Sequence, residues 1–311
     1  MRVISGYLWL WVLVAVFAAL KLPFLFLGLK PVIKPLLAFV LLSMGLTLKP
    51  EEFSLLLKKP KLVVVGLFTQ YTVMPFVGFA VAKLLYKGLP KVFTAGEVLT
   101  GSCPTGVVSN VYNFLTGANL ALSLALSGVN TLVSPFLTPL LTKLLAAKVV
   151  EVNALSLFKD MVLLTLLPVT VGLAASGLFK ERVERVKPVL PELSALAVVL
   201  IVGFVVAAGK DKIEALPAEG LLLLVAGVTV HLLLGFWLGY LIPRFLGIPP
   251  RERVTISIET AMQNSGLATV LAVTHWGPLA ALPAVVYSVV QNLVGPFVVK
   301  LFRAIHGRHL K

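Results

Sequence analysis

The chain has 311 residues, of which 13% are charged, whereas about 25% are charged in ordinary soluble domains. Hydrophobic residues make up 59% of the chain and its mean hydropathy is +1.00, which excludes an ordinary soluble globular protein. The net charge of +14 could indicate nucleic-acid binding, but the Lys and Arg residues lie between the apolar segments, where they act as topology signals and contact anionic lipid head groups. We therefore predict an all-α polytopic membrane protein that binds no nucleic acid.

Ten apolar segments have about the length that a helix needs to cross a bilayer, which is roughly 20 residues. They are predicted at 7–27, 31–48, 62–85, 92–115, 119–142, 154–178, 190–208, 220–242, 252–274 and 278–301. The first segment also has the outline of a signal peptide, but no small-x-small cleavage site precedes a polar sequence, so we assign it to the first span. Ten spans place both termini on one side, which receives 16 Lys and Arg residues against 11 on the other. The positive-inside rule thus predicts cytoplasmic termini. We expect the protein in the cell inner membrane.

Ten spans divide into two five-helix repeats, residues 1–150 and 151–311. Because five is an odd number, the second repeat would enter the membrane in the opposite orientation. Such inverted repeats are common in secondary transporters, whose binding sites lie in interrupted helices at matching positions of the two halves. The fourth and ninth spans are the matching pair that we inspect for interruptions.

Both of these spans contain helix-breaking or polar sequences in the middle. In span four, Gly101, Pro104 and Gly106 predict a break, because proline lacks an amide hydrogen and glycine favours non-helical backbone. In span nine, a polar stretch over 258–266 interrupts an apolar helix, and Gly266 is the predicted breakpoint. Either motif alone could be a kink used for packing, whereas their symmetric positions favour a binding site.

Glu259 is the most informative residue, because a carboxylate at the centre of a spanning helix costs several kcal/mol unless it is compensated. No Lys or Arg lies inside a neighbouring span, so a bound cation or protonation is the remaining compensation. Gln263 lies four residues later on the same helix face. The alternative is a carboxylate that faces a water-filled crevice or is held as the neutral acid. Glu97, six residues after Lys91, could reach the interface, which leaves Glu259 as the one carboxylate firmly within a span.

Span five carries a stripe of hydroxyl and amide groups at spacings of three and four residues. Its members are Asn119, Ser123, Ser127, Asn130, Thr131 and Ser134. Neutral oxygens with a single carboxylate suit a monovalent hard cation, and sodium is the natural candidate. The alternative is that the stripe forms hydrogen bonds between helices.

Other polar positions in the spans are weaker candidates. Gln70, Gln291 and Asn292 could face the same centre or bridge helices. His231 is isolated among Val and Leu residues and is predicted to be a packed neutral histidine. No sequence pattern supports a metal site other than sodium, and no catalytic constellation supports an enzyme.

These residues resemble the bile acid:sodium symporter family, and the resemblance covers nearly the whole chain. It is carried by Met44 to Pro50, Cys103-Pro104, Ser109 to Val111, Asn119 to Ser123, Thr131 to Pro139, and Ile258-Glu259 with Met262 to Ala268. The resemblance implies a ten-helix transporter with a panel domain of spans 1, 2, 6 and 7. Spans 3–5 and 8–10 would form the core domain, in which the discontinuous helices four and nine cross.

The resemblance also implies the binding residues. A first sodium site would use Ser109, Asn110, Ser123, Ser127 and Glu259; at Ser127 similar proteins often have Thr. A second site would use Gln70, Glu259, Gln263 and the main-chain oxygens of Thr260 and Met262. The substrate is expected at the crossing, with Asn264, Thr105, Val107 and Asn292 as its candidate contacts. At Val107 the sequence departs from the family pattern and loses a hydroxyl, which Thr105 could replace.

The function implied is sodium-coupled symport of an organic anion, such as a bile acid or small carboxylate, by alternating access. Bile-acid-like steroids, 2-oxo acids and pantoate-like hydroxy acids are all compatible with the family. Sodium would be the coupling ion, and no other cofactor and no protein partner is predicted. The alternatives are a sodium/proton exchanger that uses Glu259 and a membrane sensor that binds a ligand without transporting it.

Overall fold

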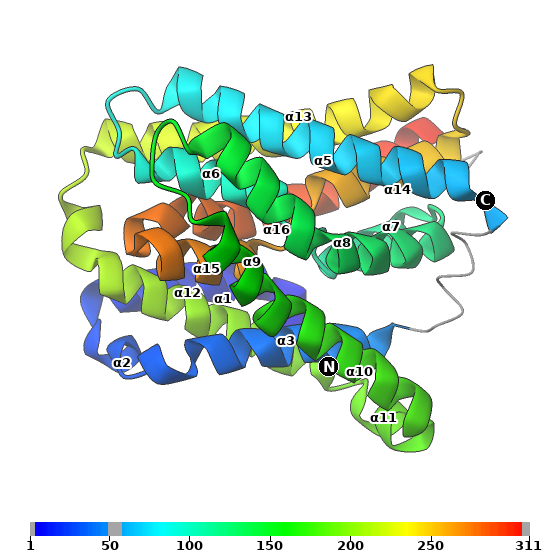
Figure 1. The fold of residues 1–311 in the computed structure, drawn as a ribbon, viewed down its shortest axis with the longest axis horizontal. Coiled ribbons are helices and arrows are strands. Elements are labelled where there is room, and N and C mark those ends of the chain that lie inside the picture. The colour runs from blue at the N-terminus through cyan, green and yellow to red at the C-terminus, as the bar shows by residue number, and fades with distance from the viewer. Residues whose placement is uncertain (1–3, 49–57, 307–311) are drawn as a thin grey trace.

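The regular structure is helical throughout the described residues, 4–48 and 58–306, of the computed structural model, apart from one isolated β-bridge between Thr105 and Gln263 (Figure 1). Within the described ranges, seven helices are long and apolar enough to cross a membrane: Lys30–Thr47, Pro60–Leu85, Leu120–Ala146, Ala154–Leu178, Leu190–Glu214, Ala218–Phe245 and Pro278–Ile305. The chain is therefore an all-helical protein with several candidate spans. Arg2, Lys49, Pro50, Arg308 and Lys311, which enter the predicted charge bias or the family motif, lie outside the described residues.

The N-terminal half begins with short helices and ends with two long ones. Its elements are η1 (Ser5–Tyr7), α1 (Leu8–Lys21), α2 (Phe24–Leu27), η2 (Lys30–Val32), α3 (Ile33–Thr47), α5 (Pro60–Leu85), α6 (Val92–Ser102), α7 (Val108–Thr116) and α8 (Leu120–Ala146). The predicted first span, 7–27, is interrupted at Leu22, whose backbone leaves the helical region. Pro23 explains this, because a proline disfavours the α conformation of the residue before it.

The C-terminal half contains longer helices. Its elements are α9 (Ala154–Met161), the π-helical turn η4 (Val162–Leu166), α10 (Leu167–Leu178), α11 (Lys180–Val186), α12 (Leu190–Glu214), α13 (Ala218–Phe245), α14 (Pro250–Ala261), α15 (Ser265–Trp276) and α16 (Pro278–His306). Helix α12 extends past the predicted end at residue 208 to Glu214, whose carboxylate lies 3.9 Å from Lys210 Nζ one helical turn earlier. The predicted span ends where the charged residues begin. In the structure the helix continues through them, because a pair at i and i+4 such as Lys210 and Glu214 stabilises a helix.

Two helices are broken where polar sequence interrupts them. Helix α6 ends at Ser102 and α7 begins at Val108, on either side of the proline that predicts this break. Helix α14 ends at Ala261 and α15 begins at Ser265, so the prediction that Gly266 is the breakpoint is wrong. The side chain of Asn264 caps α15 by accepting a hydrogen bond from the amide of Leu267 at 3.1 Å, which starts this helix one residue before the glycine.

The helices pack as two groups (Figure 1). Helix α3 packs against α10 and α12, and α12 also packs against α1; these lie in the lower part of the view. The second group contains α5, α6, α7, α8, α13, α14, α15 and α16, which pack against one another above them. Contacts of α12 with α15 and α16, and of α8 with α9, join the two groups. The two broken helices belong to the second group, so the site is built on one set of packed helices.

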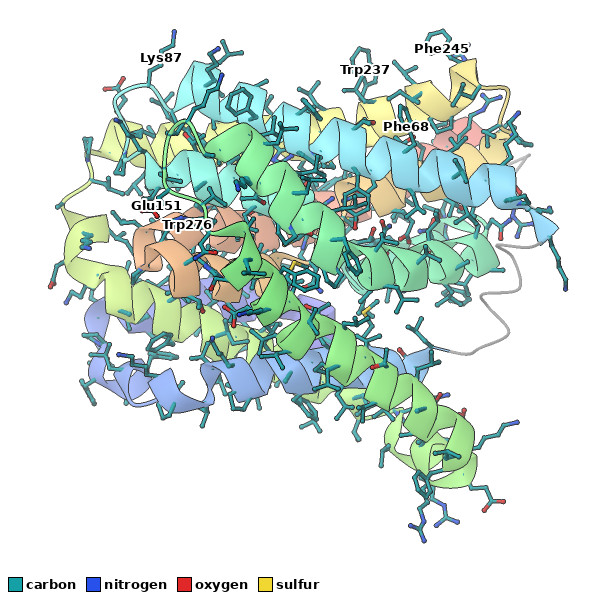
Figure 2. All side chains as sticks on the ribbon, in the orientation of Figure 1. Phe68, Lys87, Glu151, Trp237, Phe245 and Trp276 are labelled. Carbon is teal, nitrogen blue, oxygen red and sulfur yellow. The ribbon has the colours of Figure 1, made fainter. Side chains whose placement is uncertain are left out.

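Apolar side chains face outward and polar side chains lie inside. Figure 2 shows Phe68, Trp237 and Phe245 projecting from the outer helices, and all three are largely exposed. Glu259 and Gln263, in contrast, are 2% and 1% exposed. A protein surrounded by lipid can expose apolar surface but must satisfy polar groups internally, so this distribution fits a membrane protein.

Close packing of α6 against α16 makes Gly96 a sensitive position. A Cβ atom there would clash with the main-chain oxygen of Ala280, which cannot rotate away. We expect Gly96→Ala to destabilise the fold by about 1–3 kcal/mol, as overpacked core substitutions do. Gly177→Ala is the matched control, because a Cβ on that helical glycine has no neighbour within 4 Å and should be neutral or stabilising. Thermal unfolding in detergent measures both, and equal unfolding temperatures would contradict the packing argument.

Candidate functional site

The site is built around the crossing of the two helix breaks. The amide of Gly106 donates to the main-chain oxygen of Met262 at 2.9 Å, and the amide of Asn264 donates to that of Pro104 at 2.9 Å. These bonds flank the antiparallel bridge between Thr105 and Gln263. The breaks are thus satisfied by each other rather than by lipid, as a membrane interior requires.

Glu259 lies beside this crossing, at the end of α14. Its Oε1 accepts a hydrogen bond from Ser123 Oγ at 2.6 Å, and its Oε2 accepts one from Ser127 Oγ at 2.9 Å. Asn110 Oδ1 lies 2.7 Å from Ser123 Oγ and 3.3 Å from Ser127 Oγ. Glu259 forms no ion pair with any Lys, Arg or His in the described part of the chain. The structure thus brings the carboxyl group of Glu259 together with an amide oxygen and two hydroxyls in the buried interior.

Two further residues of α7 border this cluster. Ser109 is fully buried, and among the described residues its Oγ has no hydrogen-bond partner. Asn113, which the sequence reasoning missed, donates from Nδ2 to Glu259 Oε1 at 3.1 Å and to Ser123 Oγ at 2.9 Å. Its position four residues after Ser109 is the signal that could have found it, since such residues share a helix face. An unpartnered buried hydroxyl next to a carboxylate is a fitting ligand for a cation.

A second group of amide side chains lies at Gln263, which is itself part of the bridge. Gln70 and Gln263 donate to each other reciprocally, at 3.0 and 3.2 Å between Nε2 and Oε1. Gln263 Nε2 also lies 2.6 Å from the main-chain oxygen of Thr260. The main-chain oxygen of Thr260 accepts this bond from Gln263, and that of Met262 accepts one from the amide of Gly106. Each of these carbonyl oxygens has a second lone pair available. Gln70, Gln263 and the main-chain oxygens of Thr260 and Met262 therefore lie close together, whereas the carboxyl group of Glu259 contacts Ser123 and Ser127.

The predicted substrate contacts differ in how they are placed. Val107 is 37% exposed at the start of α7, and Asn264 is partly exposed at the start of α15. Thr105 is fully buried, where its hydroxyl donates to the main-chain oxygen of Glu259 at 2.9 Å and accepts from Asn130 Nδ2 at 3.0 Å. Asn292 donates to a main-chain oxygen of its own helix, that of Ser288. The structure therefore brings only the first two residues to an accessible side of the crossing.

Gln291, rather than its neighbour Asn292, contacts the crossing from α16. Its Oε1 accepts from the amide of Gln263 at 3.1 Å, and its Nε2 donates to the main-chain oxygen of Gln263 at 3.1 Å and to Ser265 Oγ at 3.2 Å. It thereby satisfies the main chain of Gln263 within the second break. The sequence placed both residues in one span but gave no means of telling which of them faces inward.

The stripe on α8 divides into two parts. Ser123 and Ser127 face Glu259, and Asn130 contacts Thr105. At the helix start Asn119 accepts from the amide of Leu122 and caps α8, and near its middle Ser134 donates to the main-chain oxygen of Thr131. The stripe thus serves the site over two turns and the helix itself elsewhere.

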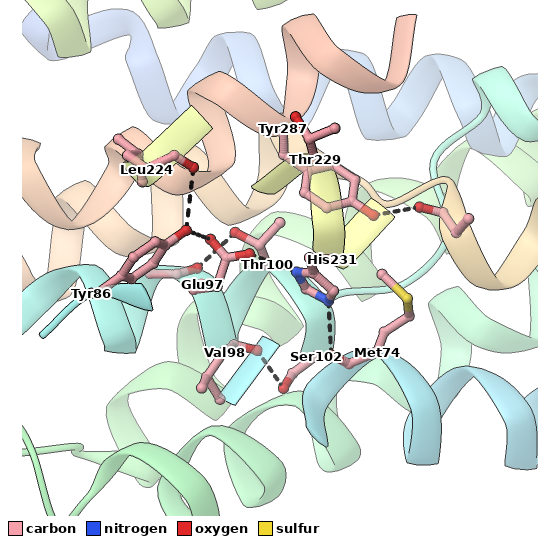
Figure 3. Close-up of polar contacts among 12 residues, drawn as sticks. Met74, Tyr86, Glu97, Val98, Thr100, Ser102, Leu224, Thr229, His231 and Tyr287 are labelled. Atoms are coloured by element: carbon pink, nitrogen blue, oxygen red, sulfur yellow. Dashed lines mark hydrogen bonds and ion pairs between the residues drawn. The ribbon is translucent and has the colours of Figure 1, made fainter. Parts of the chain in front are cut away.

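Glu97 of α6 and His231 of α13 form a buried pair (Figure 3). His231 Nδ1 is 2.6 Å from Glu97 Oε1, and its Nε2 is 2.9 Å from the main-chain oxygen of Met74. Tyr86 donates to Glu97 Oε2 at 3.0 Å, and the ring of Tyr287 packs edge-on against His231. Glu97 is fully buried, so the expectation that it could reach the interface is wrong. His231 is packed in the interior as predicted, but the sequence gave no sign that Glu97 is its partner.

Comparisons with known proteins identify the family to which this chain is similar. The sequence pattern described as "Sodium Bile acid symporter family" matches residues 34–216. The protein named "Uncharacterized sodium-dependent transporter YocS" of Bacillus subtilis is 36% identical over 286 residues, which are 92% of this chain and 87% of that protein. Two proteins named "Probable sodium/metabolite cotransporter BASS1, chloroplastic" are each 35% identical to this chain. The protein from Arabidopsis thaliana aligns over 86% of this chain and 65% of its own length, and that from Oryza sativa over 95% and 72%.

These matches cover most of the chain, including the first broken helix, and the relatives are named as transporters rather than enzymes. The apolar helices independently indicate a multi-pass membrane protein. The chain belongs to the sodium bile acid symporter family, a family of sodium-dependent transporters.

Proposed function

We propose that this protein is a sodium-coupled symporter of an organic anion. The observation that carries the proposal is Glu259, whose buried carboxylate has only neutral hydrogen-bond donors around it. A lone charge in the membrane interior is costly, and a cation among these oxygens would remove most of that cost. The sodium dependence named for the relatives supports sodium as this cation.

The first sodium site in this proposal uses Ser109, Asn110, Ser123, Ser127 and Glu259. The support is the hydrogen-bonded cluster described above and the unpartnered hydroxyl of Ser109. The second site uses Glu259, Gln263, Gln70 and the main-chain oxygens of Thr260 and Met262. Because one carboxylate serves both sites, two bound sodium ions would be coupled through it.

The substrate in this proposal binds where the half-helices α7 and α15 begin. The bridge brings both N-termini to the crossing, and the positive ends of their dipoles favour an anion. Asn264 uses its oxygen to cap α15, which leaves its Nδ2 group as a donor toward a carboxylate. Val107 adds apolar surface beside it, whereas Thr105 is a positioning residue that holds the main chain of Glu259. This supports an anion with an apolar part, such as a bile acid or small organic acid.

Transport by alternating access requires two bodies that move relative to each other. The proposed panel domain contains α1, α3, α9–α10 and α12, and the core domain contains α5–α8 and α13–α16, so the chain forms ten spans as an inverted repeat. The two groups of packed helices and the symmetric breaks support this assignment. Bound sodium would hold the crossing in its binding geometry, and the anion would then bind at the two half-helix N-termini. Rocking of the panel domain against the core domain would expose the site to one side of the membrane and then the other. The charge bias supports cytoplasmic termini in the cell inner membrane.

Uptake into proteoliposomes tests the proposal. With a panel of radiolabelled bile acids, 2-oxo acids and hydroxy acids, we expect uptake of one class to require an inward sodium gradient and to stop when potassium replaces sodium. Sodium alone should raise the unfolding temperature, because a ligand at 100 times its Kd adds about 2.7 kcal/mol of stability. A sodium-driven pH change without organic anion would instead support an exchanger. Binding of an anion without flux under any gradient would support a sensor.

A further inference from the structure

An apolar groove on the outer face of the molecule lies between α13 and α16. It has a volume of about 700 Å³, and its apolar lining includes Leu233, Trp237, Leu301 and Ile305. The groove follows α13 from Leu233 to Arg244, a rise of eleven steps and about 16 Å at 1.5 Å per residue. This is about half of the roughly 30 Å hydrocarbon thickness of a bilayer, so the groove has the depth of one leaflet.

The end of the groove near the helix termini carries two positive charges. Arg244 is exposed in the last turn of α13, and Arg253 is partly buried in the first turn of α14. Arg253 donates from Nε to the main-chain oxygen of Ile248, and its guanidinium lies 6.0 Å from the centre of the Tyr240 ring. Tyr240 in turn stacks on Phe302 of α16. The second guanidinium is thus held in place at the mouth of the groove.

No carboxylate balances these charges at the groove. The residues that line it include no Asp or Glu, and neither arginine forms an ion pair with a carboxylate in the described parts of the chain. The nearby Glu252 accepts a hydrogen bond from Asn119 Nδ2 at 3.1 Å, on the side of α8. The groove therefore offers two unbalanced guanidinium groups above a leaflet-deep apolar surface.

We propose that this groove binds one anionic phospholipid, with its phosphate between Arg244 and Arg253 and an acyl chain along Trp237 and Leu301. Guanidinium groups bind phosphate oxygens through paired, charge-assisted hydrogen bonds. Basic pockets between membrane helices are suited to anionic head groups, and this pocket has no acidic group to meet the cation of a zwitterionic lipid. The groove that would hold the lipid lies between α13 and α16, and none of its lining residues belongs to the proposed sodium or substrate sites.

Trp237 provides a direct probe, because it is one of four tryptophans in the chain. In a variant with Trp9, Trp11 and Trp276 replaced by Phe, only Trp237 fluoresces. We expect phosphatidylglycerol with brominated acyl chains to quench it at concentrations at least about ten-fold lower than brominated phosphatidylcholine in detergent micelles. Equal quenching by both lipids would overturn the proposal, since it would show an apolar surface without head-group selection.

The arginines are tested by substitution in the same background. Arg244→Gln with Arg253→Gln should raise the phosphatidylglycerol concentration for half-quenching at least about ten-fold, whereas Arg251→Gln, an exposed arginine outside the lining, should not change it. Unchanged quenching in the double variant would overturn the proposal. If glycerol phosphate alone protects the protein from thermal unfolding as well as the lipid does, the site binds a free anion. If the transported anion competes with the brominated lipid, the groove belongs to the substrate, and this too would overturn it.

Discussion

Glu259→Gln should abolish sodium-dependent uptake while leaving the protein folded. Glutamine keeps the shape of the side chain and removes the charge that Ser123, Ser127 and Asn113 surround. Two opposite unit charges about 4 Å apart attract by about 4 kcal/mol at an effective dielectric constant of about 20, so loss of the charge should weaken sodium binding at least about 100-fold. Without sodium the variant should unfold at the same temperature as the parent or higher, because it no longer buries an unbalanced charge. Sodium titration monitored by thermal unfolding, combined with uptake in proteoliposomes, measures both effects.

Glu219→Gln is the control for this substitution. Glu219 is an exposed carboxylate in the first turn of α13, so its loss changes the net charge equally without touching the crossing. The control should keep both the sodium-dependent uptake and the sodium-dependent stabilisation. If Glu259→Gln were still stabilised by sodium to the same extent as the control, this carboxylate would not be a sodium ligand.

Breaking the Glu97–His231 pair should cause the largest loss of stability. Met74 contributes a main-chain oxygen, which can only accept, so His231 Nε2 carries a hydrogen. One further proton must then lie between Nδ1 and Glu97 Oε1 at 2.6 Å, and the pair is neutral as a unit. Removal of either partner leaves the other unpaired in the interior, at a cost of about 3–5 kcal/mol. We therefore expect Glu97→Ala and His231→Ala to lower the unfolding free energy by this amount each.

A double-mutant cycle separates the pair from ordinary loss of packing. The double variant should be less destabilised than the sum of the single variants by about 2 kcal/mol or more, because it leaves no unpaired partner. Tyr86→Phe removes one hydrogen bond to Glu97 and should cost only about 1 kcal/mol. Additive single effects, or single effects no larger than that of Tyr86→Phe, would show that the two side chains are not coupled.

The sequence predicts the interruptions of the helices because their causes are local. Pro104 removes an amide hydrogen wherever the helix is packed, and α6 does end two residues before it. The second break was misplaced because Gly266 tolerates helical backbone, and the capping side chain of Asn264 decides where α15 begins. A glycine only permits a helix to end. The position of this break is set by the capping side chain of Asn264, directly after the bridge residue Gln263.

Contacts between distant segments were harder to predict. Glu259 stood out from burial cost alone, and Gln263 and Ser127 followed from helical spacing and from the family resemblance. Glu97 and His231 lie 134 residues apart, and neither sequence neighbourhood indicates that the other is opposite. A sequence shows that a charged or polar residue needs a partner within the membrane, but only packing of α6 against its neighbours identifies that partner.

The crossing itself is held together by main-chain atoms. The bonds from Gly106 to Met262 and from Asn264 to Pro104 join amides to carbonyls, which every residue except proline can provide on both sides. The side chain at the accessible position Val107 can therefore change without loss of this joint. A scaffold of this kind can accept a new cargo by substitution at its exposed positions while the geometry around its buried carboxylate stays constant.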